Sequence, residues 1–185
     1  PDFVRFVDWT GACPIFQGKI PGGNYNYNFN AHKFGRKVFV VTDKRLRDEP
    51  FFFLGADVHI HKSIPKEWPD RLIYRKAGVF LLRHHLDTHV ESDFAGYDPR
   101  HPNMALLLDK YRAIFNNGGF LLRKGWHDCA ALDILLEHFD LLRDVNNLSA
   151  GVRGDDVKGW HVWPKTELAE YMIHLKGRLK KEKAA

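Results

Sequence analysis

Two pairs of histidines have a spacing that metal-binding sites use. His59 and His61 flank a single residue near what reads as the end of a strand, so both imidazoles would project from the same face. His85 and His89 stand four residues apart, a spacing that would place them on one face of a helix. Imidazoles held in this way can bind a metal ion that activates water. The four histidines therefore make a metal-dependent hydrolase one candidate function.

Acidic residues close behind the second pair could complete such a ligand set. Glu91 and Asp93 follow His89 and offer carboxylate oxygens. Barrels built around a histidine pair on a strand, however, usually need about 250 residues with alternating strands and helices. This chain has 185 residues and lacks that alternation. The length and pattern thus disfavour a metal site built from these histidines, and we expect neither a cofactor nor a resident metal.

Three further segments contain residue types that occur in functional sites. Cys129 follows His127 by two positions, a combination compatible with a thiol nucleophile, but the cysteine begins an apolar helix, where a thiol behaves as a small hydrophobic group. Asp155 and Asp156 could bind a cation, although an exposed acidic loop explains them equally well. Gly22 and Gly23 do not belong to any glycine-rich phosphate-binding motif. None of these segments predicts an active site.

The composition is that of a folded protein with a basic end. Hydrophobic residues make up 44% of the chain and aromatic residues 14%, which excludes a largely disordered protein. The formal net charge is +5, and much of the excess lies in the segment 176–183. Such a tail suits an acidic protein surface or anionic lipid as a partner. The absence of a concentrated basic face before residue 176 disfavours RNA.

Other features of the sequence bear on its compartment. The longest uncharged apolar run, 77–82, is far shorter than the roughly 20 residues that span a bilayer, so no transmembrane segment is expected. Cys13 and Cys129 lack the spacing of a zinc site and are expected to be reduced thiols. The sequence begins at Pro1 without a leader, which is compatible with an imported and processed protein.

Hydrophobic periodicity predicts an α+β fold in two parts. Residues 1–72 are expected to form a β-rich module, a small antiparallel meander, and 73–185 a helical extension. A short helix is predicted within 64–72, a strand or helix within 77–91, and a loop over 93–103. The predicted strands are 3–9, 15–20, 24–30, 37–42 and 51–61. The predicted long helices are 104–116, 128–143 and a last one that starts after Thr166.

Aromatic side chains alternate with polar ones in the third predicted strand. Tyr25, Tyr27 and Phe29 would share one face, and Phe39 follows on the next strand, with Lys and Arg interleaved. Such a face could stack RNA bases. A buried core face is the commoner use of aromatic residues on a strand, and we prefer it here. Trp160 and Trp163 are interpreted as an exposed aromatic clamp for a neighbouring protein.

The segment 18–72 resembles a known family. It contains GKIPGGNYNYNFN, then Phe34-Gly35-Arg36 followed by VFVV, then Pro65-Lys66-Glu67-Trp68. In order and spacing these elements resemble the accessory-subunit family of mitochondrial NADH:ubiquinone oxidoreductase (complex I) that is paralogous to the assembly factor mimitin.

The resemblance implies a non-catalytic subunit of the respiratory chain. Such a protein would lie peripherally on the matrix face of the mitochondrial inner membrane and contact other subunits of complex I. Gly35 and Arg36 would fix a turn and provide a polar anchor. Glu67 and Trp68 would dock the end of the meander. Tyr25 and Tyr27 would fill an interface or the core. The metal-dependent hydrolase and an RNA-binding protein of the mitochondrial ribosome stay open as alternatives.

Overall fold

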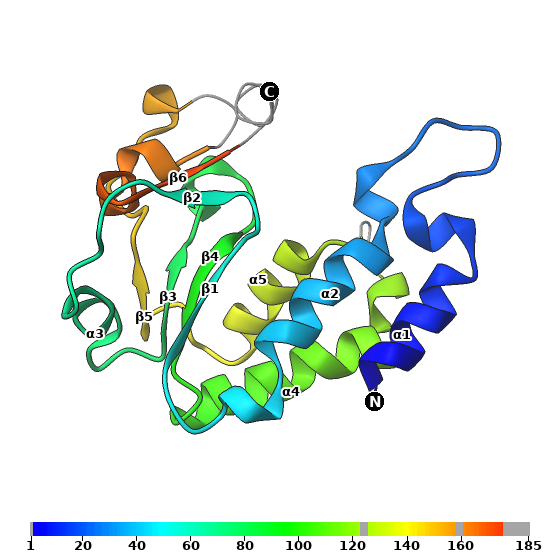
Figure 1. Cartoon of the computed structure of the whole chain (residues 1–185), viewed down its shortest axis with the longest axis horizontal. Helices are drawn as coiled ribbons and strands as arrows, with labels where there is room; N and C mark the ends of the chain where they lie inside the picture. Colours follow the sequence, from blue (N-terminus) through cyan, green and yellow to red (C-terminus); the bar gives the residue numbers. More distant parts are fainter. Residues whose placement is uncertain (1, 123–125, 158–160, 176–185) are drawn as a thin grey trace. The chain divides into compact units, whose positions relative to one another are not determined.

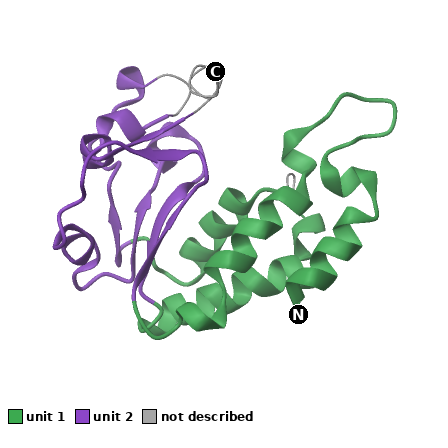
Figure 2. Cartoon of the chain, in the orientation of Figure 1, with its two compact units in different colours: residues 1–49, 99–142 green, residues 50–98, 143–185 purple. Residues whose placement is uncertain are grey.

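The computed structural model describes residues 2–122, 126–157 and 161–175, and it has an α+β fold (Figure 1). This confirms the predicted class. The chain divides into two compact units, each built from two separate segments (Figure 2). Unit 1 comprises Pro1–Glu49 and Pro99–Leu142, and unit 2 comprises Pro50–Asp98 and Arg143–Ala185. This division differs from the expected one at residue 72.

Unit 1 is helical and has an aromatic core. Phe6, Phe115 and Phe120 are buried and lie ring against ring, and Phe39 packs on Phe6 with ring centroids 5.1 Å apart. Tilted and edge-on ring pairs of this kind add to the free energy of apolar burial. The helices are α1 (Asp2–Gly11), α2 (Ala31–Val41), α4 (Pro102–Asn116) and α5 (Asp128–His138).

The helices α1 and α2 replace the strands predicted at 3–9 and 37–42, so those predictions were wrong. The buried positions of α2 include Ala31, Phe34, Val38 and Phe39, which recur at the helical spacing of three and four. The side chain of Asn30 caps this helix by accepting a hydrogen bond from the Lys33 N–H at 2.9 Å. A cap and a period of 3.6 thus outweigh the strand propensity of the valines.

The alternating segment 24–30 is also not a strand. It forms a loop with one 3₁₀ turn, Tyr27–Phe29, because the Asn26 side chain accepts a hydrogen bond from the backbone N–H of Asn28 at 3.0 Å. Asparagine side chains compete with the backbone partners that a strand would need. The segment 15–20 is likewise mostly a 3₁₀ turn, Pro14–Gln17. The predicted N-terminal meander is therefore corrected to helices and loops up to residue 50.

Replacing Gly35 with alanine should test how α1 and α2 pack. A Cβ at Gly35 would lie 2.1 Å from the Cε1 atom of Phe6, so the two helices would have to move apart. We expect a loss of about 1–3 kcal/mol in the free energy of unfolding measured in urea, despite the higher helix propensity of alanine. Gly11→Ala is the matched control, because nothing lies within 4 Å of its added Cβ. Equal stability of both variants would contradict this packing.

The described residues of unit 2 form two β-sheets. In the four-stranded sheet, β4 and β3 are central, in the order β1-β4-β3-β5; β4 pairs antiparallel with β1 and β3, and β3 pairs parallel with β5. The second sheet is the antiparallel pair of β2 and β6. The strands are β1 (Phe51–Leu54), β2 (Val58–Ile60), β3 (Gly78–Leu81), β4 (Glu91–Tyr97), β5 (Val145–Asn147) and β6 (Met172–His174).

Several predicted elements of the later chain are confirmed. The strands around Gly55, the short helix α3 (Trp68–Ile73) and the long helices α4 and α5 all form as expected. Strand β4, however, occupies a segment predicted to be a loop. Its Gly96 looked like a turn former, but it leaves room for the Phe52 ring, since a Cβ there would lie 2.7 Å from Phe52 Cε1.

The helix predicted after Thr166 is wrong in its described part. A 3₁₀ turn, Glu167–Glu170, leads into β6. The apolar residues of the predicted helix, which include Leu168, Tyr171 and Met172, are nevertheless buried, together with Phe94 of β4. Pairing with β2, which is distant in sequence, thus decides the local structure. The rest of this predicted helix, from residue 176, lies outside the described residues.

Trp163 belongs to the core of unit 2. It is 1% exposed, and its indole N–H donates a hydrogen bond to the backbone carbonyl of Met172 at 3.1 Å. The prediction of an exposed clamp is therefore wrong for Trp163, whose single polar atom is satisfied within the core. Trp160 lies outside the described residues. No helix in the described ranges is long and apolar enough to span a membrane.

Candidate metal centre

Three side chains of types that ligate metals converge in unit 2. Asp57, Asp93 and His174 each offer one ligand atom, and these atoms all lie within 4.8 Å of one another. Asp57 lies in the turn before β2, Asp93 lies on the central strand β4, and His174 ends β6. The group thus joins one turn and two strands that are far apart in sequence.

The imidazole of His174 lies between the two carboxylates. Its Nε2 atom is 3.3 Å from Asp93 Oδ2 and 3.4 Å from Asp57 Oδ1. The histidine is 1% exposed, whereas both aspartate side chains are partly exposed. The imidazole therefore forms the buried end of the group, and the two carboxylates form the end that solvent can reach.

Backbone hydrogen bonds fix the segments that carry these side chains. The Gly55 N–H donates to the carbonyl of Asp93 at 2.8 Å, and the Leu175 N–H donates to the carbonyl of Asp57 at 2.8 Å. A Cβ at Gly55 would lie 2.9 Å from Asp93 Oδ1 and 3.0 Å from Asp57 Oδ1. The glycine therefore leaves the space in which the two carboxylates approach each other.

Aromatic rings hold the imidazole of His174 in place. The Trp163 ring centroid lies 5.2 Å from that of His174, and the His161 centroid lies 5.6 Å away in an edge-on arrangement. The Nδ1 atom of His174 is buried and has no hydrogen-bond partner among the described residues. Packing, more than hydrogen bonding, thus sets the orientation that points Nε2 at the carboxylates.

The spacing and the donor types suit one divalent ion. Metal–ligand bonds of about 2.0–2.6 Å allow two ligands of one ion to be at most about 4–5 Å apart, and this group meets that limit. One imidazole with two carboxylates is a mixed donor set that suits Mn²⁺ or Zn²⁺. The two carboxylates are the anionic ligands that divalent cations favour. Three protein ligands would leave further positions for water or substrate.

Glu91, two residues before Asp93 on β4, belongs to a buried ion pair. Arg83 Nη1 is 3.2 Å from Glu91 Oε2, and the Arg83 Nε–H donates to the carbonyl of His89 at 2.9 Å. Both charged side chains are almost fully buried. Burial of an ion pair is tolerated only when the charges compensate each other. We therefore assign Glu91 a structural function, joining the ends of β3 and β4.

A second group, His127, Asp128 and Cys129, opens helix α5 in unit 1. Asp128 is buried and forms an ion pair with Lys37, whose Nζ lies 3.0 Å from Asp128 Oδ2. The Cys129 thiol is buried as well. Because Lys37 already compensates the carboxylate, this group reads as a structural anchor between α2 and α5.

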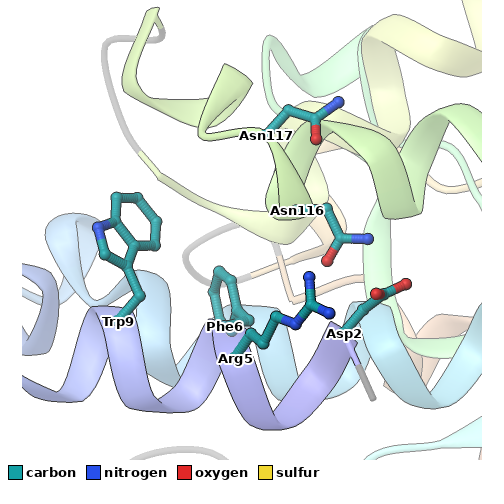
Figure 3. Close-up of a pocket in the computed structure, with 6 residues that line it drawn as sticks. All are labelled: Asp2, Arg5, Phe6, Trp9, Asn116 and Asn117. Atoms are coloured by element: carbon teal, nitrogen blue, oxygen red, sulfur yellow. The ribbon is translucent and has the colours of Figure 1, made fainter.

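Unit 1 also contains a small cavity of about 240 Å³ between α1 and the end of α4 (Figure 3). Hydrogen bonding from Asn116, with a smaller contribution from Arg112, lowers the pKa of Asp2 at its edge. The volume is below the roughly 300–1,000 Å³ of typical ligand sites. The lining residues are Asp2, Arg5, Phe6, Trp9, Asn116 and Asn117. We assign no function to this cavity.

The structure does not assemble the histidine set considered from the sequence. His59, His61, His85 and His89 are all exposed, and none belongs to either group of ligand-type side chains found among the described residues. His85 lies in a 3₁₀ turn and His89 beyond it, so the expected helical face does not exist.

Two of the three residues of the metal centre were missed from the sequence. Asp93 was noted for its carboxylate, whereas Asp57 and His174 were not considered. Asp57 precedes His59 by two residues on the same segment, a local signal that could have found it. His174 gave no such signal, because its segment has the pattern of a helix.

The residues that the resemblance pointed to have varied environments. Tyr25, Tyr27, Arg36 and Glu67 are exposed, and Gly35 lies inside α2, not in a turn. Trp68 is buried at the start of α3, and its indole N–H donates to Glu167 Oε2 at 3.1 Å.

No family model, curated protein or solved structure matches this chain.

Proposed function

We propose that unit 2 binds one divalent metal ion through Asp57, Asp93 and His174, and that the protein is a metal-dependent hydrolase. The observation that carries the proposal is the convergence of two carboxylates on a buried imidazole nitrogen, at 3.3 and 3.4 Å, from two strands and a turn. Gly55 supports it, because the glycine keeps open the space that both carboxylates enter.

The chemistry of such a centre is that of water activation. A bound divalent ion lowers the pKa of a coordinated water and polarises the bond under attack. The two aspartates would fix the ion from the solvent side, and the buried histidine would fix it from the core. Trp163 would hold the imidazole ring in the orientation that coordination requires.

Phosphate esters are the substrate class that this centre fits best. Phosphoryl oxygens are hard ligands that complete the coordination of such ions.

The proposal is tested by hydrolysis of bis(p-nitrophenyl) phosphate by the full chain with Mn²⁺, Mg²⁺ or Zn²⁺. We expect turnover that EDTA abolishes and that Asp57→Asn lowers by about 100-fold or more. Asp156→Asn, an exposed carboxylate of the same unit, is the matched control and should leave the rate unchanged. Turnover insensitive to both EDTA and Asp57→Asn would reject the centre. Absence of turnover with a bound ion would reject the hydrolase.

A second proposal is the accessory subunit of mitochondrial complex I that the resemblance implies. Exposed apolar side chains on unit 1 favour it, since apolar and aromatic residues dominate the cores of protein interfaces. They include Phe3, Val4, Trp9, Leu121 and Leu122. Blue-native electrophoresis separates the candidates: comigration with complex I supports this proposal, and comigration with ribosomal particles supports the RNA-binding alternative.

A further inference from the structure

The stretch that includes the loop between α1 and α2 and helix α2 itself contains cations and no acidic residue. Between Asp8 and Asp43 the sequence contains no Asp or Glu. Lys19, Lys33 and Arg36 in this stretch are exposed. A surface of one sign attracts an anionic partner, and does so over a distance of about 10 Å at moderate salt.

Tyr25 presents an aromatic ring that the loop holds in place. One side of the ring lies against Gly18, where a Cβ would be 2.7 Å from Tyr25 Cε2, and Gly18 has the positive φ of 79° that glycine tolerates. Asn30 Nδ2 donates a hydrogen bond to the Tyr25 hydroxyl at 3.0 Å. The residue nevertheless remains 56% exposed. An exposed, fixed aromatic ring is suited to stacking, because little entropy is lost when a flat ligand binds.

The backbone of the loop supports this arrangement. The Asn26 N–H donates to the Gly18 carbonyl at 2.8 Å, and Lys19 and Tyr25 form an isolated antiparallel bridge. Figure 1 shows the loop standing out from α1 and α2, the helices of its own unit. The bridge places the Lys19 backbone directly opposite that of Tyr25, so the two side chains leave the same face of the pairing.

Tyr27 is a second exposed aromatic residue of this loop, and a cation lies over its ring. It is 43% exposed, and Lys33 Nζ lies 4.5 Å from its ring centroid. Arg36 follows Lys33 by three residues on α2, so the two cations lie on adjacent turns. Asp128 reaches this region from α5, but Lys37 compensates its charge.

We propose that this surface, which we call the tyrosine loop and define by Lys19, Tyr25, Tyr27, Lys33 and Arg36, binds single-stranded nucleic acid. Aromatic rings that stack bases, interleaved with cations that contact phosphates, are the recognition chemistry of single strands. A duplex keeps its bases stacked on one another and would use only the cations. The inference does not rest on the metal centre, since stacking and phosphate contacts require no ion.

The test is fluorescence anisotropy of labelled oligo(dT) and oligo(U) of about 15 nucleotides, a length matched to typical single-strand sites. The full chain is used in EDTA, so failure of the hydrolase would not affect the result. We expect Tyr25→Ala to weaken binding about tenfold and Tyr25→Phe to preserve it, because the ring does the stacking. The double variant Lys33→Gln/Arg36→Gln should lower the slope of log K against log salt by about 1.4.

Matched controls separate the tyrosine loop from general surface effects. Tyr74 is 67% exposed, and the Arg75 guanidinium lies over its ring, so Tyr74→Ala removes a comparable aromatic group elsewhere. Lys44→Gln/Lys110→Gln removes two exposed cations from the same unit. We expect both control variants to bind as the native chain does.

Three outcomes would overturn the inference. The first is equal affinity for the oligonucleotides and for their duplex. The second is unchanged binding by both Tyr25→Ala and the Lys33→Gln/Arg36→Gln variant. The third is displacement of oligonucleotide by polyglutamate, or by phosphatidylserine vesicles, at equal charge concentration, which would assign the surface to an acidic protein or to a membrane.

Discussion

Replacing Arg83 with methionine is expected to lower the free energy of unfolding by about 3–5 kcal/mol, because it leaves the carboxylate of Glu91 buried without its guanidinium. In the native chain the side chains of Arg83 and Glu91 are only 10% and 6% exposed, and their atoms approach to 3.2 Å. The same variant loses the hydrogen bond that Arg83 donates to the backbone of His89. Urea denaturation followed by circular dichroism measures the loss.

A double variant separates an uncompensated charge from lost packing. Arg83→Met combined with Glu91→Leu removes both charges and should recover most of the stability, since apolar replacement of a buried pair is often neutral. Lys62→Met is the matched control, because the Lys62–Glu170 pair at 2.7 Å is exposed and contributes little. A loss below about 1 kcal/mol in Arg83→Met would contradict the assignment of a structural ion pair.

Replacing Asp93 with asparagine is expected to weaken Mn²⁺ binding by at least about 100-fold, because the site loses one of its two anionic ligands and affinity follows ligand charge. Asparagine has nearly the same shape, and the Asp93 backbone carbonyl still accepts the hydrogen bond from Gly55. The fold should therefore survive the substitution. Isothermal titration calorimetry with Mn²⁺ gives the affinity.

The acidic loop of unit 2 supplies a control for this prediction. Asp155→Asn/Asp156→Asn removes two exposed carboxylates, which by themselves bind cations only weakly. These substitutions should leave the affinity for Mn²⁺ unchanged. Equal affinities of Asp93→Asn and the native chain, or a loss as large in the Asp155→Asn/Asp156→Asn variant, would place the ion elsewhere.

The parts of the fold that periodicity predicted correctly have strong local signals. Helix α4 presents buried Met104, Leu107, Leu108 and Tyr111 at the helical spacing. Two strands flank Gly55 as expected. The residues of these elements favour the observed structure by themselves, so it could be predicted without knowledge of their tertiary contacts.

The incorrectly predicted elements were decided by partners that the sequence does not reveal. The valines of α2 favour a strand, yet a cap at Asn30 and burial of Phe34 against the unit 1 core select a helix. Conversely, the segment of β6 has a helical pattern but pairs with β2, more than a hundred residues earlier.

The metal centre also depends on strand pairings between segments that are distant in sequence. His174 meets Asp57 only through the β2–β6 ladder, and Asp93 joins them through the pairing of β4 with β1. The histidine pairs drew attention because they are close in sequence, whereas a site assembled from a turn and two distant strands has no short sequence spacing to recognise.

Titration of the full chain with Mn²⁺, monitored by electron paramagnetic resonance, tests the metal centre most directly. We predict that one equivalent of Mn²⁺ binds, and that ¹⁵N labelling of histidine alters the hyperfine spectrum of the bound ion. His174→Ala should remove that nitrogen coupling, whereas His59→Ala, an exposed histidine of the same unit, should keep it. Absence of a bound equivalent, or a nitrogen coupling that persists in His174→Ala, would contradict a metal centre formed by Asp57, Asp93 and His174.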